Sequence, residues 1–154
     1  REPGIVGAAL AHAEYAELIP DLIHVHPGAI RVALRAIPHL YCVTDSTSAT
    51  GMPDGEYSLG SQTVHKCLGG VRLADGTLAG STLTMIGALK NLHQIGLTVQ
   101  EASHRLSGVP AQYLGLSQLG RIATGCVADI LQVNNQLELN KVYLRGTEWE
   151  QQNA

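Results

Sequence analysis

Apolar residues follow two different patterns in the first third of the chain. Residues 5–16 carry small apolar side chains with a helical rhythm, and residues 29–37 place apolar side chains on one helical face that ends before Pro38. Two uninterrupted apolar runs, residues 22–26 and 40–44, alternate with these segments. Strands without polar alternation are typical of a parallel sheet that is buried on both faces. The pattern therefore predicts helix, strand, helix and strand in an α/β fold.

The middle of the chain has the composition of an antiparallel sheet. Residues 51–80 are dense in glycine and turn-forming residues, and short alternating runs occur at residues 56–59 and 63–67. The dipeptide Asp75-Gly76 is a favourable hairpin turn between two strands. We therefore expect antiparallel strands in this part of the chain.

Helices followed by strands are predicted for the remaining residues. Ser81 or Thr82 can cap a helix that runs to residue 94, and Thr98 can cap a second helix over residues 99–106. One further helix and two strands are predicted at residues 110–116, 128–133 and 137–144.

Composition and charge exclude several classes of function. The 154 residues are 45% apolar and 4% aromatic with no phenylalanine, so the core must be aliphatic. The net charge of −3 argues against a basic groove for nucleic acid, and no apolar run approaches the roughly 18 residues of a membrane helix. Cys42, Cys67 and Cys126 are far apart, which is typical of reduced thiols in a cytoplasmic protein. Because the chain starts at Arg1 rather than at a methionine, we expect it to be a cut piece.

Three titratable side chains stand at the predicted ends of the two apolar strands. His24 and His26 end the first run, and Asp45 directly follows the second. Residues i and i+2 of a strand share a face, and parallel strands end at one edge of a sheet, so these groups can form a metal site or an acid–base site. Two alternatives stay open. In one, His26 caps the following loop and only His24 points inward, and in the other, Asp45 merely forms a turn.

Four motifs, in the same order and at similar spacing, resemble the C-terminal part of a known family. They are Arg-Glu-Pro-Gly at residues 1–4, Asp-Leu-Ile-His-Val-His-Pro at 21–27, Val-Thr-Asp at 43–45 and Gly-Thr-Leu-Ala-Gly-Ser-Thr-Leu-Thr-Met at 76–85. Residues 119–130 also resemble the tail of the superfamily. Together the motifs resemble the N-acetylglucosamine-6-phosphate deacetylases of the amidohydrolase superfamily, over essentially all 154 residues.

The resemblance implies a fold as well as an activity. The family has a (β/α)8 barrel and a small β-sandwich, and a barrel alone needs about 250 residues. We therefore expect this chain to supply the last two barrel strands, at residues 19–26 and 40–45, with their helices. In this interpretation residues 1–118 belong to the barrel domain, including a β-hairpin insertion, and residues 119–154 are strands of the β-sandwich.

The implied reaction is metal-dependent deacetylation of N-acetylglucosamine 6-phosphate to glucosamine 6-phosphate and acetate. Asp45 matches the proton donor and acceptor of the family and can also contact a second metal ion. The residues that match substrate-binding positions are Arg1, for the phosphate, His24, and the backbone of Leu78, Ala79 and Gly80. The family holds a divalent metal, zinc or a similar ion, through a Glu and two His upstream of Arg1. We therefore expect no complete metal site in this segment, and no activity from the segment alone.

The resemblance further implies the partners and the compartment. The expected partners are a small amino-sugar phosphate, the N-terminal remainder of the enzyme and a second copy in a homodimer, in the cytoplasm and without nucleic acid or membrane. Three alternatives stay open. The chain can belong to an amidohydrolase that acts on a different amide or a cyclic ureide, serve as a non-catalytic packing or oligomerisation module, or form half of a split enzyme.

Overall fold

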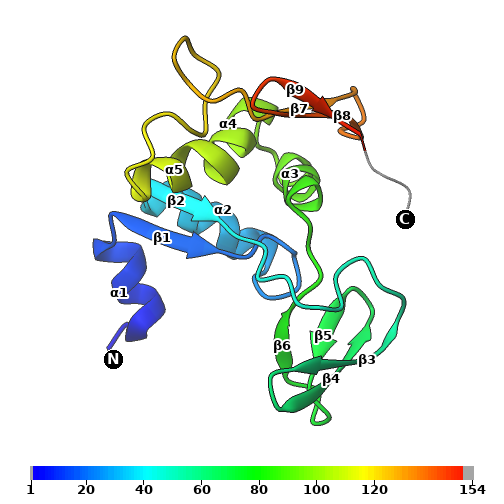
Figure 1. Ribbon diagram of the computed structural model, residues 1–154. Helices are drawn as coiled ribbons and strands as arrows, with labels where there is room; N and C mark the ends of the chain where they lie inside the picture. The colour runs from blue at the N-terminus through cyan, green and yellow to red at the C-terminus, as the bar shows by residue number, and fades with distance from the viewer. Residues whose placement is uncertain (1, 151–154) are drawn as a thin grey trace.

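Two parallel strands joined through a helix lie in the first third of the chain. The computed structural model describes residues 2–150 (Figure 1). Strand β1 (Tyr15–Leu18) pairs in parallel with β2 (His39–Cys42), and helix α2 (Pro27–Ala36) connects them. Helix α1 (Gly4–His12) precedes β1 and contacts α2. The predicted strand–helix–strand unit is therefore confirmed, although its first strand lies earlier in the chain than expected.

The prediction of a strand at residues 22–26, or 19–26 in the family interpretation, is wrong. The strand ends at Leu18, and Pro20 follows it. The carboxylate of Asp21 then accepts hydrogen bonds from the backbone N–H groups of Ile23 and His24, at 3.0 and 2.9 Å, and Leu22 has a φ of 65°. These bonds stabilise a turn, because they give the backbone an alternative to ladder pairing. The helix predicted over residues 5–16 likewise ends early, at His12.

Helices from the second half of the chain pack against β2 and α2. They are α3 (Met85–Gln94), α4 (Val99–Ser103), the π-helix η1 (His104–Gly108) and α5 (Val109–Tyr113). Together with α2 and β2 they bury an aliphatic core built around Ile30, Cys42, Leu92 and Leu106. The expectation of an aliphatic core is confirmed, and burial of such side chains contributes about 1.5–3 kcal/mol each.

The helix caps agree with the sequence at one position and differ at another. Thr98 caps α4 through a capping box, in which the carboxylate of Glu101 accepts the N–H of Thr98 at 2.9 Å and Thr98 Oγ1 accepts the N–H of Glu101 at 3.2 Å. The cap predicted at Ser81 or Thr82 is wrong, because Thr84 caps α3 by accepting the N–H of Gly87 at 3.1 Å.

Two antiparallel sheets complete the fold. The first, at the lower right of Figure 1, has the order β3-β4-β5-β6, with strands β3 (Gly55–Leu59), β4 (Gln62–Cys67), β5 (Gly70–Arg72) and β6 (Leu78–Ser81). The second, at the top, has the order β7-β8-β9, with strands β7 (Ile130–Val133), β8 (Leu139–Leu144) and β9 (Thr147–Trp149). Both sheets were expected, with the turn at Asp75-Gly76, but β9 was not. Strand β8 begins at Leu139 rather than at residue 137, because Leu137 closes a turn with a φ of 57°.

The architecture is thus mixed α/β, with a parallel strand pair, a helical layer and two separate antiparallel sheets. Within residues 2–150, no helix is both long and apolar enough to cross a membrane.

Candidate functional site

Asp45 lies three residues beyond the end of β2, at the carboxyl edge of the parallel pair. Its side chain is exposed, and its backbone has a φ of 50°, in the left-handed region that aspartate tolerates better than most residues. Strained backbone of this kind concentrates at functional positions when the surrounding structure holds it in place. The neighbouring end of β6 provides that support.

Ser81, at the end of β6, is the residue that holds the Asp45 loop. The N–H of Ser81 donates to the carbonyl of Asp45 at 2.8 Å, and the carbonyl of Ser81 accepts the N–H of Thr47 at 3.0 Å. Its hydroxyl donates to the carbonyl of Thr44 and accepts the N–H of Leu83 at 2.9 Å. Ser81 itself is fully buried, so water does not compete for its own groups in these bonds. The loop from residue 44 to 47 is therefore anchored to β6.

Gly80 lies close to the Asp45 loop, where a side chain would clash with Thr47. Its φ of 90° lies in the left-handed region, and a Cβ atom added there would come within 2.6 Å of Thr47 Cγ2 and 3.6 Å of Asp45 Oδ2. Of the three predicted substrate-contacting backbone positions, Gly80 is therefore the one that the structure brings against Asp45. Ala79 packs on the buried cluster of Ala49, Val64 and Val71, and Leu78 pairs with Arg72 in the sheet.

The helix expected to begin after a cap at Ser81 or Thr82 begins instead at Met85. Residues 82–84 separate the helix from β6, because β6 continues as strand to Ser81 and Thr84 is the cap. Arg1, the predicted phosphate-binding residue, lies outside the residues that the structure describes.

His24 forms a short contact with a nearly buried carboxylate. Its Nδ1 lies 2.6 Å from Asp21 Oδ2, and the side chains of His24 and Asp21 are 18% and 4% exposed. Burial by itself would raise the pKa of Asp21, but hydrogen bonds from the backbone N–H groups of His24 and Ile23 and from the His24 ring hold it below the ordinary 3.8. Asp21 is therefore an ionised acceptor at neutral pH.

His26 serves as the N-cap of α2. Its Nδ1 accepts the N–H of Gly28 at 3.1 Å, and Pro27 occupies the first helical position. The open alternative for His26 is therefore right only in part: His26 is a cap, but of helix α2 rather than of a loop, and its ring lines the same cavity as that of His24.

A large apolar cavity of about 1070 Å³ brings His24, His26 and Asp45 onto one surface. Its other walls are aliphatic side chains of α1, β1 and α2, such as Leu10, Leu18 and Val32. Among the described residues, β1 pairs only with β2, so the opposite edge of β1 carries no ladder partner. The cavity exceeds the typical upper limit of about 1,000 Å³ for a small-molecule site.

The donor atoms in this cavity do not form a metal site. Within residues 2–150, no group of three or more His, Cys, Asp and Glu side chains is arranged to hold an ion. Nδ1 of His24 is occupied by Asp21, and Nδ1 of His26 is occupied by the N–H of Gly28.

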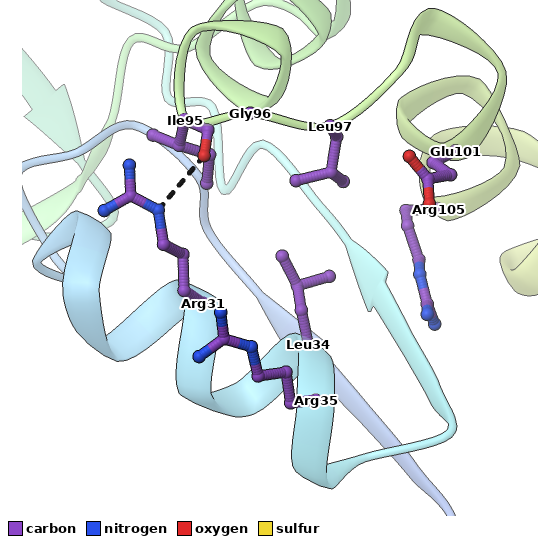
Figure 2. Close-up of a pocket in the computed structure, with 8 residues that line it drawn as sticks. All are labelled: Arg31, Leu34, Arg35, Ile95, Gly96, Leu97, Glu101 and Arg105. Atoms are coloured by element: carbon purple, nitrogen blue, oxygen red, sulfur yellow. Dashed lines mark hydrogen bonds between the residues drawn. The ribbon is translucent and has the colours of Figure 1, made fainter.

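A second cavity, of about 320 Å³, is lined by three arginines but serves helix packing (Figure 2). Arg31 donates from Nε to the carbonyl of Ile95 at 3.1 Å, where α3 ends. Arg105 donates to the carbonyls of Pro38 and Leu40 at 2.8 and 3.0 Å. Because these guanidinium groups satisfy backbone carbonyls, they fix the ends of the helices and of the loop before β2.

Two residues of the site were not identified from the sequence. Asp21 has no role in the predicted site, yet it contacts the His24 ring three positions later, and this Asp-x-x-His spacing is the available signal. Ser81 was interpreted as a helix cap, whereas it is the buried hydrogen-bonding residue beneath Asp45. No pattern in the sequence separates these two roles for a serine after a glycine.

Comparison with known proteins identifies the class of enzyme. The chain is 40% identical over 150 residues to the N-acetylglucosamine-6-phosphate deacetylase of Vibrio furnissii, which covers 95% of this chain and 38% of that protein. It is 39% identical over 150 residues to a protein of Escherichia coli strain K12 provisionally named N-acetylgalactosamine-6-phosphate deacetylase, with 95% of this chain and 90% of that protein covered. No family model matches the chain.

The fold is also similar to that of a solved structure of such a deacetylase. The N-acetylglucosamine-6-phosphate deacetylase of Thermotoga maritima superimposes with a TM-score of 0.88 at 35% identity, over 94% of this chain and 41% of that one. Fold and relatives thus define an enzyme class, the deacetylases of N-acetylhexosamine 6-phosphates. The chain belongs to the N-acetylglucosamine-6-phosphate deacetylase family. It spans 38–39% of the length of the first curated relatives that it matches.

Proposed function

We propose that this chain carries the proton-transferring part of a deacetylase that converts N-acetylglucosamine 6-phosphate and water into glucosamine 6-phosphate and acetate. The observation that carries the proposal is the position of Asp45. Its carboxylate follows a parallel strand, lines the cavity that His24 also lines, and lies against Gly80. Carboxyl ends of parallel strands are where catalytic groups of such folds lie.

Asp45 has the chemistry that amide hydrolysis needs. As the attacking water adds to the acetamide carbonyl, it loses a proton, which the carboxylate accepts. The carbon–nitrogen bond then breaks, and the leaving sugar amine gains that proton from Asp45. His24, on the same cavity, binds the sugar phosphate through a ring nitrogen. The backbone approach at Gly80 keeps the space beside the carboxylate free for the acetamide group.

We propose that the rest of the active site comes from family residues outside this chain. In this proposal residues 1–118 belong to a (β/α)8 barrel and residues 119–154 to its β-sandwich. The unpaired edge of β1 and the open apolar cavity beside it support a further parallel strand at this position. A divalent metal and the Arg1 contact to phosphate belong to the same proposal, as do a homodimer and a cytoplasmic location. Free Cys42, Cys67 and Cys126 suit a reducing compartment.

Reconstitution tests this function directly. The chain alone, supplied with zinc, should release no acetate from N-acetylglucosamine 6-phosphate. Mixed with the N-terminal part of the Thermotoga maritima relative, it should do so, and Asp45→Asn in the mixture should abolish turnover while circular dichroism stays unchanged. Turnover by the chain alone would contradict the dependence on outside residues. A mixture that assembles, binds zinc and remains inactive would contradict the proposed reaction.

N-acetylgalactosamine 6-phosphate is a second candidate substrate. Relatives named for this epimer are 39% identical to the chain, against 40% for a relative named for the gluco form. Comparing kcat/KM for the two epimers in the same mixture separates the candidates. A preference for an unphosphorylated amide or a cyclic ureide would instead favour another amidohydrolase activity.

A further inference from the structure

Asp21 and His24 form a hydrogen-bonded pair beside the large cavity. In addition to stabilising the turn, Asp21 contacts the His24 ring. Asp21 uses its two carboxylate oxygens for different tasks. Oδ1 accepts the backbone N–H groups of Ile23 and His24, while Oδ2 lies 2.6 Å from Nδ1 of the His24 ring. With a side chain that is only 4% exposed, Asp21 has little water to compete for either oxygen.

The contact decides which ring nitrogen of His24 carries the proton. An ionised carboxylate can only accept a hydrogen bond, so Nδ1 must be the donor. In the neutral ring the proton is then on Nδ1, and Nε2 keeps a free lone pair. Nδ1 faces the nearly buried Asp21, and the ring lines the large cavity, so Nε2 is the ring nitrogen left for a ligand.

His26 has the opposite arrangement. Its Nδ1 accepts the N–H of Gly28, so the neutral ring of His26 carries its proton on Nε2. Two histidines separated by one residue are therefore held in different tautomers by two different partners. His26 provides an internal reference for any measurement made on His24.

We propose that Asp21 is a positioning residue, which holds His24 in the Nδ1–H tautomer so that Nε2 accepts a hydrogen bond from a hydroxyl group of the sugar phosphate. This inference rests on the proposed function for the identity of the ligand. The tautomer itself is a property of the chain alone. A carboxylate that orients an imidazole from behind is a recurring device for fixing which nitrogen faces the substrate.

Asp21→Asn separates the positioning role from the turn. The amide oxygen of asparagine can still accept the N–H groups of Ile23 and His24, so the turn is retained. Its NH2 group, however, donates to Nδ1 and so favours the Nε2–H tautomer. Asp75→Asn is the matched control, because Asp75 also accepts a backbone N–H two residues later, from Thr77 at 2.9 Å, and contacts no histidine among the described residues.

The experiment is a multiple-bond 1H–15N spectrum of the chain labelled at histidine nitrogens, at a pH where the rings are neutral, with His24→Gln and His26→Gln used for assignment. We expect Nδ1–H for His24 and Nε2–H for His26 in the wild type. Asp21→Asn should convert His24 to Nε2–H, and Asp75→Asn should change neither ring. An Nε2–H ring for His24 in the wild type, or an unchanged tautomer in Asp21→Asn, would overturn the proposal.

A second readout links the tautomer to the substrate. In the reconstituted mixture, Asp21→Asn should raise KM for N-acetylglucosamine 6-phosphate about tenfold, the effect of losing one hydrogen bond, with Asp75→Asn unchanged. An Asp21→Asn variant with a switched tautomer and an unchanged KM overturns the positioning role. An inactive wild-type mixture counts against the proposed function alone, because the spectrum tests the pair without turnover.

Discussion

The backbone N–H of Ser81 donates a hydrogen bond of 2.8 Å to the carbonyl of Asp45, and so joins the end of β6 to the loop after β2. These residues are 36 positions apart in the sequence, and an isolated parallel bridge between Ser46 and Ser81 continues the contact. The antiparallel sheet β3–β6 is thus joined to the loop that carries the candidate site. Its last strand determines where the candidate catalytic carboxylate lies.

Ser81→Ala should destabilise the protein and displace Asp45. The substitution leaves the carbonyl of Thr44 and the N–H of Leu83 without their side-chain partner in a buried position, and each unsatisfied group costs about 1–3 kcal/mol. Urea unfolding followed by circular dichroism measures the change in unfolding free energy. Ser61→Ala is the control, since Ser61 is exposed, and it should stay within about 0.5 kcal/mol of wild type. Equal stability of the two variants would contradict the role assigned to Ser81.

Gly80→Ala tests whether the packing of Gly80 against the Asp45 loop matters beyond the strain of a positive φ. Gly80 and Gly76 have nearly the same φ, 90° and 88°, but a Cβ at Gly76 meets no atom within 4 Å, whereas one at Gly80 meets Thr47 at 2.6 Å. Gly76→Ala should therefore cost only the roughly 1–2 kcal/mol of a left-handed alanine. Gly80→Ala should cost more and should also lower turnover in the reconstituted mixture, because Thr47 must move and it lies in the same loop as Asp45. If both variants lose the same unfolding free energy and keep turnover, the close contact between Gly80 and Thr47 contributes neither to stability nor to activity.

The α/β pattern could be predicted because uninterrupted apolar runs indicate buried strands and turn dipeptides indicate where strands are connected. The same reasoning failed at residues 22–26, which are apolar but form a turn. The cause is a side-chain effect that periodicity does not report, namely the competition of the Asp21 carboxylate for the backbone N–H groups. Pro20 ahead of Asp21 was the available warning, since the strand ends just before it.

The candidate site could be predicted only in part, for a related reason. Asp45 follows from the end of a predicted strand, whereas His24 follows from its motif, because the strand expected at residues 22–26 is a turn. Both residues line the same cavity. The sequence predicts Ser81 or Thr82 as the helix cap, whereas Thr84 is the cap in the structure. Which residue caps the helix depends on where β6 ends. That end is set by pairing with distant strands, which the local sequence does not contain.

The acid sensitivity of the fold should depend on Asp21. Its pKa in the folded protein is below the ordinary 3.8, so the unfolded chain binds more protons in the acid range. The stabilisation from this carboxylate is complete above pH 3.8 and is lost as the pH falls through the lower, folded pKa. Near pH 6, Asp21→Asn should be less stable than wild type by about 1 kcal/mol, and this difference should shrink towards pH 2. Urea unfolding at a series of pH values measures it, and a difference that stays constant from pH 6 to pH 2 would contradict the expectation.

Cys42 should resist alkylation in the folded protein. Burial raises the pKa of its thiol to about 12, against a smaller lowering effect of Arg105, and the residue is only 2% exposed. The nucleophilic thiolate is therefore scarce at pH 8, and the reagent cannot reach it. Cys67 and Cys126 are half-buried and serve as internal controls. With iodoacetamide at pH 8 and peptide mass spectrometry, we expect labelling of Cys67 and Cys126 well before Cys42, and equal labelling of all three in 8 M urea. Labelling of Cys42 at the rate of the other two without urea would mean that α3 and α4 do not pack over β2 as described.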